Sequence, residues 1–310
     1  MAVLIAGSTG LAGSAIANAF ESIGEEVIRV NRSVVDLKDV AATKKFLKRT
    51  KPALVVDAAA KVGGIGVNNS KPVEFLADNL QIQSSLMQGA FEAGVEKFVF
   101  LGSSCIYPRD CAQPIKEEFL MTGPLEPTNS AYAVAKIAGI EMINSYRKEH
   151  GLNWVSLMPT NLYGPRDNFN LSEAHVLPAL IRRFVEAEVS DAEDVTLWGT
   201  GSPLREFLHV DDLANAVVKA SENYSESLHL NVGTGHELSI KAIAELIAHE
   251  AGFKGDINWD STKPDGTPRK VLDVSRITSM GWKPTITLEE GVASTITWFK
   301  EAVSKGEARL

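Results

Sequence analysis

The chain has 310 residues, of which 45% are hydrophobic and 23% are charged, as expected of a folded globular protein rather than a disordered or fibrous one. Its 31 Lys and Arg residues against 39 Asp and Glu residues give a net charge of -8, which argues against a nucleic acid or a membrane as partner. Two cysteines are too few for a disulfide scaffold, and the sequence lacks the paired Cys and His ligands of a metal site. We expect a cytoplasmic enzyme with no signal peptide, no membrane span and no bound metal.

The first half of the chain alternates between short apolar runs and longer helical patterns. Such runs are typical of strands buried on both faces, and the helical patterns are long enough to connect parallel strands. The alternation predicts an α/β fold with a Rossmann-type, doubly wound parallel sheet. The expected strands cover residues 2–6, 26–30, 53–58, 97–101 and 154–158, and the expected helices cover residues 13–23, 40–49, 72–93 and 130–150.

After Gly164 this alternation is lost and turns rich in Pro, Asn and Gly appear. We expect a smaller, discontinuous α/β domain here that binds the substrate, with residues 1–164 and about 206–236 in the sheet domain and about 165–205 and 237–310 in the smaller one. The elements expected are helices at 176–187, 239–251 and 288–303, a helix start at 209–212, a strand at 229–232, a Gly-rich turn at 199–202 and a Pro- and Gly-rich stretch at 263–269.

A glycine-rich segment follows the first predicted strand and opens the first predicted helix. In this setting glycines let the backbone approach a pyrophosphate, and free helix N–H groups bind it. An isolated glycine triplet can form an ordinary turn, but the surrounding βαβ pattern favours a dinucleotide site, and the GxxGxxG spacing is of the short-chain dehydrogenase type. The segment consists of Gly7, Ser8, Thr9, Gly10, Leu11, Ala12 and Gly13.

Arg32 follows the second predicted strand, at the position where a dinucleotide's ribose is read. A guanidinium there pairs with a 2′-phosphate, whereas a carboxylate would bind a 2′-hydroxyl. Asp36 lies close by in the sequence, so a solvated surface Arg32 is the alternative. We expect NADP as the cofactor.

Tyr132 and Lys136 are four residues apart on one predicted helix, so their side chains share a face. We expect the ammonium to lower the pKa of the phenol, which then donates a proton to an alkoxide. Ser103 follows the fourth predicted strand, where open α/β sheets present ligand groups, and its hydroxyl is suited to polarising a carbonyl. A Tyr-x-x-x-Lys pair alone is weak evidence, but all three residues after a dinucleotide loop predict a reductase.

Several further residues carry useful chemistry but also have ordinary structural explanations. Cys105 should project near the cleft of Ser103, although a free cysteine is more often a small buried hydrophobe. An isolated histidine such as His175 is more often a helix cap. Arg183 and Arg205 are two cations that suit a diphosphate, and Trp198 offers an aromatic plane for the attached base. The alternative is that the two arginines lie on the surface and the tryptophan in the core. For the cluster His209, Asp211 and Asp212, helix capping explains the pattern better than a metal does.

Six longer strings are together typical of one group of enzymes. They are AAAKVGGI at 58–65, GSSCIYP at 102–108, LEPTN at 125–129, MPTNLYGP at 158–165, REFLHVDD at 205–212 and KPDGTPRK at 263–270. Over almost its whole length the chain resembles the bifunctional epimerase-reductases of the extended short-chain dehydrogenase/reductase family. The resemblance implies conversion of GDP-4-keto-6-deoxy-D-mannose to GDP-L-fucose, by epimerisation at C3 and C5 and NADPH-dependent reduction at C4, in a homodimer formed through the two long helices at 72–93 and 130–150.

The resemblance also implies roles for individual residues. Ser103, Tyr132 and Lys136 would carry the reduction, with Cys105 as base and His175 as acid in the epimerisation. Arg183, Trp198, Arg205 and Lys270 would contact the nucleotide sugar. Besides the glycine segment and Arg32, the cofactor would be bound by Leu101, Gly102, Lys136, Pro159, Thr160, Asn161, Leu162 and His175.

Two other functions stay open at this point. A nucleotide-sugar 4-epimerase or 4,6-dehydratase would share the three reductase residues, but a dehydratase needs carboxylates near Ser103, where this sequence has Ser104 and Cys105. A non-catalytic NADP-binding regulator would keep the glycine segment without needing the other three.

Overall fold

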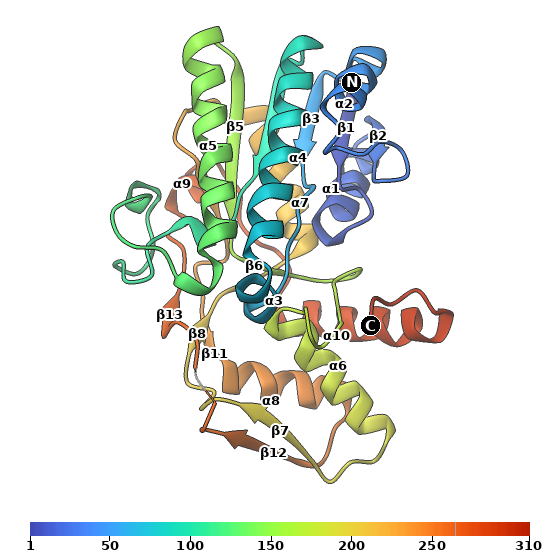
Figure 1. Ribbon diagram of the computed structural model, residues 1–310. Helices are drawn as coiled ribbons and strands as arrows, with labels where there is room; N and C mark the ends of the chain where they lie inside the picture. The colour runs from blue at the N-terminus through green and yellow to red at the C-terminus, as the bar shows by residue number, and fades with distance from the viewer. Residues whose placement is uncertain (264) are drawn as a thin grey trace.

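The computed structural model describes residues 1–263 and 265–310 (Figure 1). Pro264, in the Pro- and Gly-rich stretch predicted at 263–269, lies outside the described residues. Six parallel strands form the central sheet in the order β10-β5-β4-β3-β1-β2, and each lies within one residue of its predicted bounds. The strands are β1 (Ala2–Ala6), β2 (Glu26–Val30), β3 (Leu54–Asp57), β4 (Lys97–Leu101), β5 (Asn153–Pro159) and β10 (Leu230–Val232).

Helices cover both faces of this sheet, so the predicted doubly wound α/β fold is confirmed (Figure 1). Alternate residues of a strand point to opposite faces, and β1 accordingly sends Val3 and Ile5 into one apolar core and Leu4 and Ala6 into the other. One face is covered by α1 (Leu11–Ser22) and α7 (Val210–Asn223), and the other by α2 (Val40–Thr50), α4 (Pro72–Glu92) and α5 (Ser130–His150). We call the sheet and these five helices the sheet lobe.

A second lobe lies below the carboxyl end of the sheet in Figure 1. Its core is a separate apolar cluster in which α6 (Val176–Val189), α8 (Ile240–Ala251) and α10 (Leu288–Lys305) pack together. Its strands are β7 (Asp194–Trp198) paired with β12 (Asp256–Asp260), and a sheet of β11 (Leu238–Ser239), β8 (Leu204–Arg205) and β13 (Arg269–Lys270). Between the lobes β6 (Asn161–Tyr163) pairs in parallel with β9 (Phe207–His209).

The remaining elements are short. They are α3 (Ile65–Ser70), α9 (Ser275–Ser279) and the 3-10 turns Ser104–Ile106, Glu117–Phe119 and Pro127–Asn129. None of the helices in the described part of the chain is long and apolar enough to cross a membrane.

The chain crosses between the lobes more than once. Leu272, Ile277 and Trp282 pack into the cores beside the sheet, although they lie in the C-terminal third of the sequence. The segment between β13 and α10 therefore anchors the second lobe to the sheet lobe.

Candidate active site

The strand order places the predicted site residues along one edge of the sheet. β1 and β3 are neighbours whose onward connections run in opposite directions, and ligands of open α/β sheets bind at the carboxyl end of such a switch point. Gly7 follows β1, Gly102 follows β4, and Thr160 follows β5, so the glycine segment and the predicted cofactor residues Leu101, Gly102, Pro159, Thr160, Asn161 and Leu162 meet at this edge.

The glycine segment is packed so tightly that larger residues would not fit. Gly7 has a φ of +77°, and a Cβ there would lie 2.7 Å from the carbonyl oxygen of Ala58. A Cβ on Gly13 would lie 2.2 Å from the carbonyl oxygen of Gly7. Gly10 is the N-cap of α1 and has no side chain to cap the first-turn N–H groups of the helix. The segment is thus a backbone cradle with helix N–H groups that can receive an anion.

Arg32 lies just beyond β2 with its side chain exposed. No ion pair joins Arg32 to the nearby Asp36 in the described structure. A carboxylate oxygen of Asp36 accepts the N–H of Lys38 at 3.0 Å. Both predicted outcomes for Arg32, solvated or bound to a phosphate, are compatible with this position.

Ser103, Cys105 and Tyr132 come together from two elements. Ser103 begins the 3-10 turn after β4, and its Oγ accepts the N–H of Cys105 at 3.3 Å. Tyr132 lies in the first turn of α5 and is buried. Burial raises the pKa of its phenol above the ordinary value, the nearby Cys105 raises it further, and a hydrogen bond with the Ser103 side chain lowers it. The structure therefore gathers these three predicted residues and keeps the phenol protonated.

Lys136 does not act on this phenol as expected. Its Nζ donates to the carbonyl oxygen of Leu101 at 2.8 Å and lies 5.9 Å from the centre of the Tyr132 ring. Burial lowers the pKa of Lys136 to about 8, although the charge of Asp57 opposes the shift. The predicted lowering of the phenol pKa is wrong for this structure, because burial of the phenol outweighs any effect of an ammonium directed elsewhere.

Asp57, at the end of β3, is a titratable group at this edge that sequence reasoning missed. Its carboxylate is buried, and burial raises its pKa to about 6 against the opposing charge of Lys136. One oxygen accepts the N–H of Ala59 at 3.2 Å, while the other has no hydrogen-bond partner among the described residues. A carboxylate at the carboxyl end of an apolar strand next to the switch point is the signal that would have found it.

The Cys105 sulfur has two nitrogen donors beside it. Asn129 Nδ2 lies 3.5 Å from Sγ, and Lys270 Nζ lies 3.7 Å from it. His175 is the N-cap of α6, at the entrance of the second lobe. Its side chain reaches solvent, but the protein atoms packed around it displace part of its hydration and so lower the pKa of the imidazole below its ordinary value. The positive charge of Lys270 lowers this pKa further. Lys270 thus lies close to both predicted proton-transfer residues.

Three of the predicted nucleotide-sugar residues lie on the strands of the second lobe. Lys270 and Arg205 are partners in the β8–β13 pairing. Trp198 ends β7 with 71% of its surface exposed, and Lys263 Nζ lies 5.8 Å above its ring. Arg183 is half-buried on α6, and no hydrogen bond or ion pair joins it to the other three within the described part of the chain. An exposed tryptophan argues against the core explanation for Trp198.

Glu206 ties these strands to the sheet, and sequence reasoning missed it too. It is fully buried, and one carboxylate oxygen accepts the N–H groups of Thr234 at 2.6 Å and Gly235 at 2.7 Å. The other oxygen accepts the N–H of Leu272 at 2.9 Å. Its carbonyl oxygen accepts Asn161 Nδ2 at 2.8 Å. Glu206 therefore fixes Arg205 next to it and the segment that follows Lys270.

In the cluster at 209–212, His209 caps α7, as predicted, whereas Asp212 binds the segment before α10. His209 is the N-cap of α7, where its Nδ1 accepts the N–H of Asp211 at 3.3 Å. Asp212 accepts the N–H groups of Thr285 and Ile286, both at 3.0 Å. In the described residues no group of three or more His, Cys, Asp or Glu side chains is placed to hold a metal ion.

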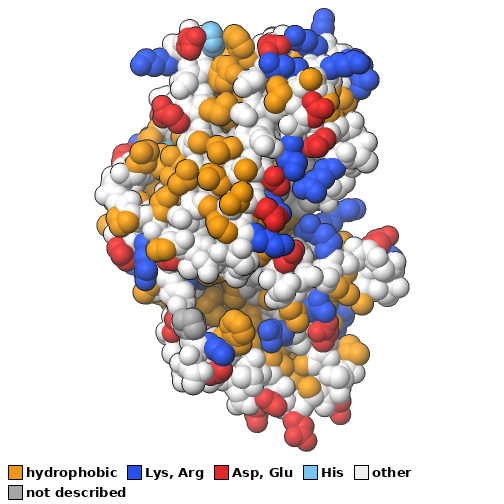
Figure 2. Space-filling view, viewed as in Figure 1, with side chains coloured by type: hydrophobic (Ala, Val, Ile, Leu, Met, Phe, Trp, Pro, Cys, Tyr) orange, Lys and Arg blue, Asp and Glu red, His pale blue; other side chains and the backbone are white. Residues whose placement is uncertain are grey.

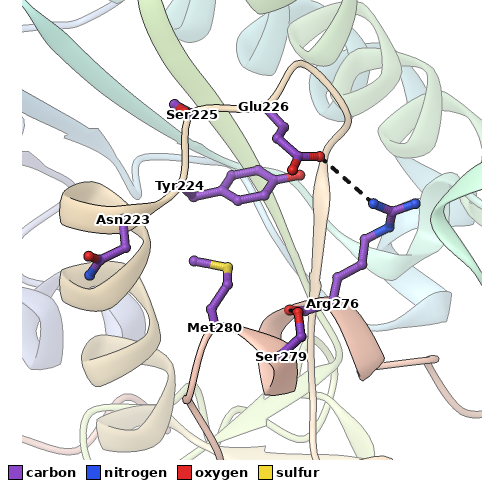
Figure 3. A pocket seen from close by; sticks show the side chains of 7 residues that line it. All are labelled: Asn223, Tyr224, Ser225, Glu226, Arg276, Ser279 and Met280. Atoms are coloured by element: carbon purple, nitrogen blue, oxygen red, sulfur yellow. Dashed lines mark hydrogen bonds and ion pairs between the residues drawn. The ribbon is translucent and has the colours of Figure 1, made fainter.

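A cavity of about 160 Å³ elsewhere is a poor ligand site (Figure 3). It is lined by Tyr224, Glu226, Arg276 and Met280, none of which was predicted to have a function. Its one cation is neutralised, because Arg276 lies 3.8 Å from Glu226 and also pairs with Glu117 and Glu118.

Comparison with known proteins identifies the family. Residues 3–233 match the NAD dependent epimerase/dehydratase family. The chain belongs to this family. A rice protein described as probable GDP-L-fucose synthase 1 is 54% identical, covering 97% of this chain and 92% of its own length. The GDP-L-fucose synthase of Escherichia coli is 48% identical, with 96% of each chain covered. The predicted resemblance is confirmed.

A solved member of the family supports the same fold. The crystal structure of a GDP-L-fucose synthetase from Naegleria fowleri bound to NADP has a TM-score of 0.91 and 28% identity, covering 100% of this chain and 96% of that one. The epimerase/dehydratase fold therefore extends over both lobes.

Proposed function

We propose that the chain converts GDP-4-keto-6-deoxy-D-mannose to GDP-L-fucose, by epimerisation at C3 and C5 followed by NADPH-dependent reduction at C4. The observation that carries this proposal is Cys105, whose sulfur lies beside the reductase residues Ser103 and Tyr132 in a chain about half identical to GDP-L-fucose synthases. A reductase needs only a proton donor near the ketone. A thiol at the same place adds a base.

The cradle at the sheet edge fits a dinucleotide. Side chains at Gly7 and Gly13 would fill it, and the first turn of α1 presents N–H groups without a side-chain cap. The residues proposed to hold NADP are Gly7, Ser8, Thr9, Gly10, Leu11, Ala12, Gly13, Arg32, Leu101, Gly102, Lys136, Pro159, Thr160, Asn161, Leu162 and His175. When bound, NADPH would supply the hydride for C4.

The epimerisation requires a base and an acid on opposite faces of the sugar. The hydrogens on C3 and C5 are both adjacent to the C4 ketone, so their removal gives an enolate. Cys105 is the proposed base, because a thiol is a suitable proton acceptor and its sulfur faces the Lys270 ammonium at 3.7 Å. His175 is the proposed acid, and even a neutral imidazole keeps one N–H to donate.

The reduction needs a proton at the C4 oxygen. Tyr132 is the proposed donor, and its raised pKa keeps the proton on the phenol until an alkoxide forms beside it. Ser103 would donate a hydrogen bond to the same oxygen. The proposed role of Lys136 is to hold the cofactor rather than to ionise the phenol, which is supported by its hydrogen bond to the Leu101 carbonyl at the sheet edge.

The second lobe supplies the proposed contacts to the nucleotide. Arg183 and Arg205 would bind the diphosphate, and the exposed ring of Trp198 offers a plane for the guanine base. Lys270 would contact the sugar, since it lies beside Cys105.

Two features of the assembly belong to the same proposal. We assign residues 1–164 and about 206–236 to a cofactor-binding domain and about 165–205 and 237–310 to a substrate-binding domain, supported by the separate apolar core of the second lobe. We also propose a homodimer through α4 and α5. Figure 2 shows an apolar area on the face of the molecule where α4 and α5 lie in Figure 1, and the exposed apolar side chains of these two helices include Val73, Phe91 and Val134.

The alternatives are less well supported. Where a 4,6-dehydratase would need carboxylates, the residues after Ser103 are Ser104 and Cys105. A regulator would not need Ser103, Cys105 and Tyr132 gathered at one point.

Product analysis tests the proposal directly. The purified protein is incubated with GDP-4-keto-6-deoxy-D-mannose and NADPH, and the sugar product is identified by NMR. We expect GDP-L-fucose with stoichiometric loss of NADPH. A product that keeps the manno configuration at C3 and C5 would leave only a ketone reductase, and no NADPH consumption would remove the enzyme assignment.

A further inference from the structure

A cavity of about 190 Å³ lies on the α1 side of the glycine segment. Ser8 and Thr9 line it from the glycine segment, and Asn31 lines it from the residue directly after β2. Arg166 lines it from the connection between β6 and α6, which passes next to α1 in Figure 1. The cavity therefore joins the cradle to the end of β2, where the ribose of a dinucleotide lies in folds of this type.

Of the two guanidinium groups that line the cavity, only one lacks a counter-charge. Arg29 forms hydrogen bonds with Glu21 at 2.8 and 2.9 Å and with Asn18 at 2.6 Å. No carboxylate of the described residues lies within 4.0 Å of the Arg166 guanidinium. Arg166 thus leaves the cavity with a net positive charge, which suits a phosphate.

The backbone holds Arg166 in a conformation that a non-glycine residue seldom adopts. Its φ is +68°, and it follows Gly164 and Pro165. The C-terminal segment of the same chain fixes this turn. Arg309 Nη2 donates to the carbonyl oxygen of Arg166 at 3.3 Å, and Phe169 N–H donates to the carbonyl oxygen of Arg309 at 2.9 Å. A strained residue that its surroundings hold in place is a candidate for a functional contact.

Neither Arg32 nor the glycine segment supplies a cation to this cavity. Arg32 is exposed and is not among the residues that line the cavity. Ser8 Oγ already donates to the carbonyl oxygen of Val30 at 3.1 Å. Thr9 and Asn31 offer polar groups but no charge, so within the cavity Arg166 supplies the available cation.

We propose that Arg166 binds the 2′-phosphate of NADPH in this cavity and thereby selects NADPH over NADH. The proposal rests on the proposed function in one respect, namely that the chain binds a nicotinamide dinucleotide at the cradle. A guanidinium pairs with a phosphate through two parallel hydrogen bonds and gains nothing from the 2′-hydroxyl of NADH. The specificity would then be read by a residue from beyond the sheet lobe, not only by the one after β2.

Dissociation constants for NADP⁺ and NAD⁺, measured by calorimetry, test this without turnover. Arg166→Asn is the variant of choice, because asparagine tolerates a positive φ and removes the charge with little change of backbone. We expect NADP⁺ to bind at least about tenfold more weakly and NAD⁺ to change less than about twofold. Arg166→Lys should recover much of the loss, and Arg49→Ala, which removes a charge on α2, should leave both constants unchanged.

The ligands 2′,5′-ADP and 5′-ADP separate the 2′-phosphate from the rest of the dinucleotide. In the parent protein 2′,5′-ADP should bind more tightly, and Arg166→Asn should abolish the difference. The proposal is wrong if NADP⁺ and NAD⁺ weaken equally, which would place Arg166 on the diphosphate, or if only Arg32→Ala changes the preference. A parent protein that binds neither dinucleotide would overturn the cofactor assignment as well, whereas GDP-L-fucose formation is measured separately.

Discussion

Cys105 is the residue that would distinguish an epimerising reductase from a simple ketone reductase. Its sulfur lies near Asn129, Lys270 and the reductase residues. A cysteine that serves only as a small buried hydrophobe would be surrounded by apolar side chains instead. Cys111, the other cysteine, is partly buried and provides a matched comparison.

We predict that Cys105→Ser slows inversion far more than reduction. A hydroxyl is a much weaker base than a thiolate, so deuterium uptake from D₂O at C3 and C5 should fall by a factor on the order of 10² or more. After hydride transfer from NADPH to C4, Tyr132 would still protonate the C4 alkoxide oxygen, giving a GDP-6-deoxyhexose of manno or talo configuration. Cys111→Ser should behave like the parent. If Cys105→Ser takes up deuterium at both carbons at the parental rate, the base lies elsewhere.

At this scale the sequence located residue types better than their interactions. Ser103 and Cys105 follow β4 and Tyr132 lies on α5, so the predicted strand and helix were enough to bring them together. The direction of the Lys136 ammonium depends on the Leu101 carbonyl, and the burial of the phenol depends on packing against residues distant in the sequence, such as Phe75. Asn129 reaches Cys105 across the start of α5, a contact that no local pattern encodes.

The turn between β1 and α1 is the element on which cofactor binding depends most. Gly13→Ala would place a Cβ 2.2 Å from the carbonyl oxygen of Gly7, so the backbone must shift. Overpacking of this kind costs about 1–3 kcal/mol, which predicts a loss of NADP⁺ affinity of roughly tenfold or more. Gly66→Ala is the control, since nothing lies within 4 Å of its Cβ position. Unchanged NADP⁺ affinity in Gly13→Ala would show that the cradle does not hold the cofactor.

A buried histidine, His229, lies directly before β10 and makes the free energy of unfolding depend on pH. His229 Nε2 lies 2.9 Å from the Tyr107 hydroxyl, and burial lowers the pKa of His229 to about 4, against the charge of Glu118. The unfolded chain binds the proton near pH 6.5 and the folded chain does not, so this contribution to stability is present above pH 6.5 and is lost as the pH falls towards 4. The loss amounts to at most about 3 kcal/mol.

Urea denaturation between pH 7.5 and 4.5 measures this effect. We predict that His229→Gln flattens the decline in the free energy of unfolding. Other groups that titrate in this range, such as Asp57 and Asp167 with raised pKa values of about 6 and 7, are common to both proteins and cancel in the comparison. Parallel curves for parent and variant would mean that His229 is protonated in the folded protein.

Elements with strong periodicity were predictable, and those defined by pairing were not. α5 begins and ends at its predicted residues. Gly151, with a φ of +68°, is the C-cap that ends the helix. β8, β11 and β13 have two residues each and exist only because they pair with one another across the chain. β7 was missed although its residues alternate between exposed and buried, a pattern that indicates a strand.

At the scale of the whole molecule, Glu206 connects the two lobes. Its carboxylate accepts three backbone N–H groups, from Thr234, Gly235 and Leu272. We predict that Glu206→Gln lowers the free energy of unfolding by about 1–3 kcal/mol, because an amide group would then face the N–H of Leu272. Glu301→Gln, which removes a charge from the exposed ion pair with Lys305 on α10, should cost less than about 1 kcal/mol. Equal losses in the two variants would contradict this connecting role.

The division into lobes was visible in the loss of alternation after Gly164, whereas the crossing of Leu272, Ile277 and Trp282 back to the sheet was not. That crossing depends on long-range pairing, such as that of Leu272 with Ile115, which lies more than 100 residues away, and the sequence offers no local signal for it.

The most direct test of the central claim is an isotope map of one turnover. The protein is incubated with GDP-4-keto-6-deoxy-D-mannose in two parallel reactions, one in D₂O with unlabelled NADPH and one in H₂O with NADPH that carries deuterium at the transferred position of its nicotinamide C4. We predict GDP-L-fucose with deuterium at C3 and C5 alone from the first reaction and at C4 alone from the second. Deuterium at C4 in the first reaction, or none at C3 and C5, would contradict the proposed function.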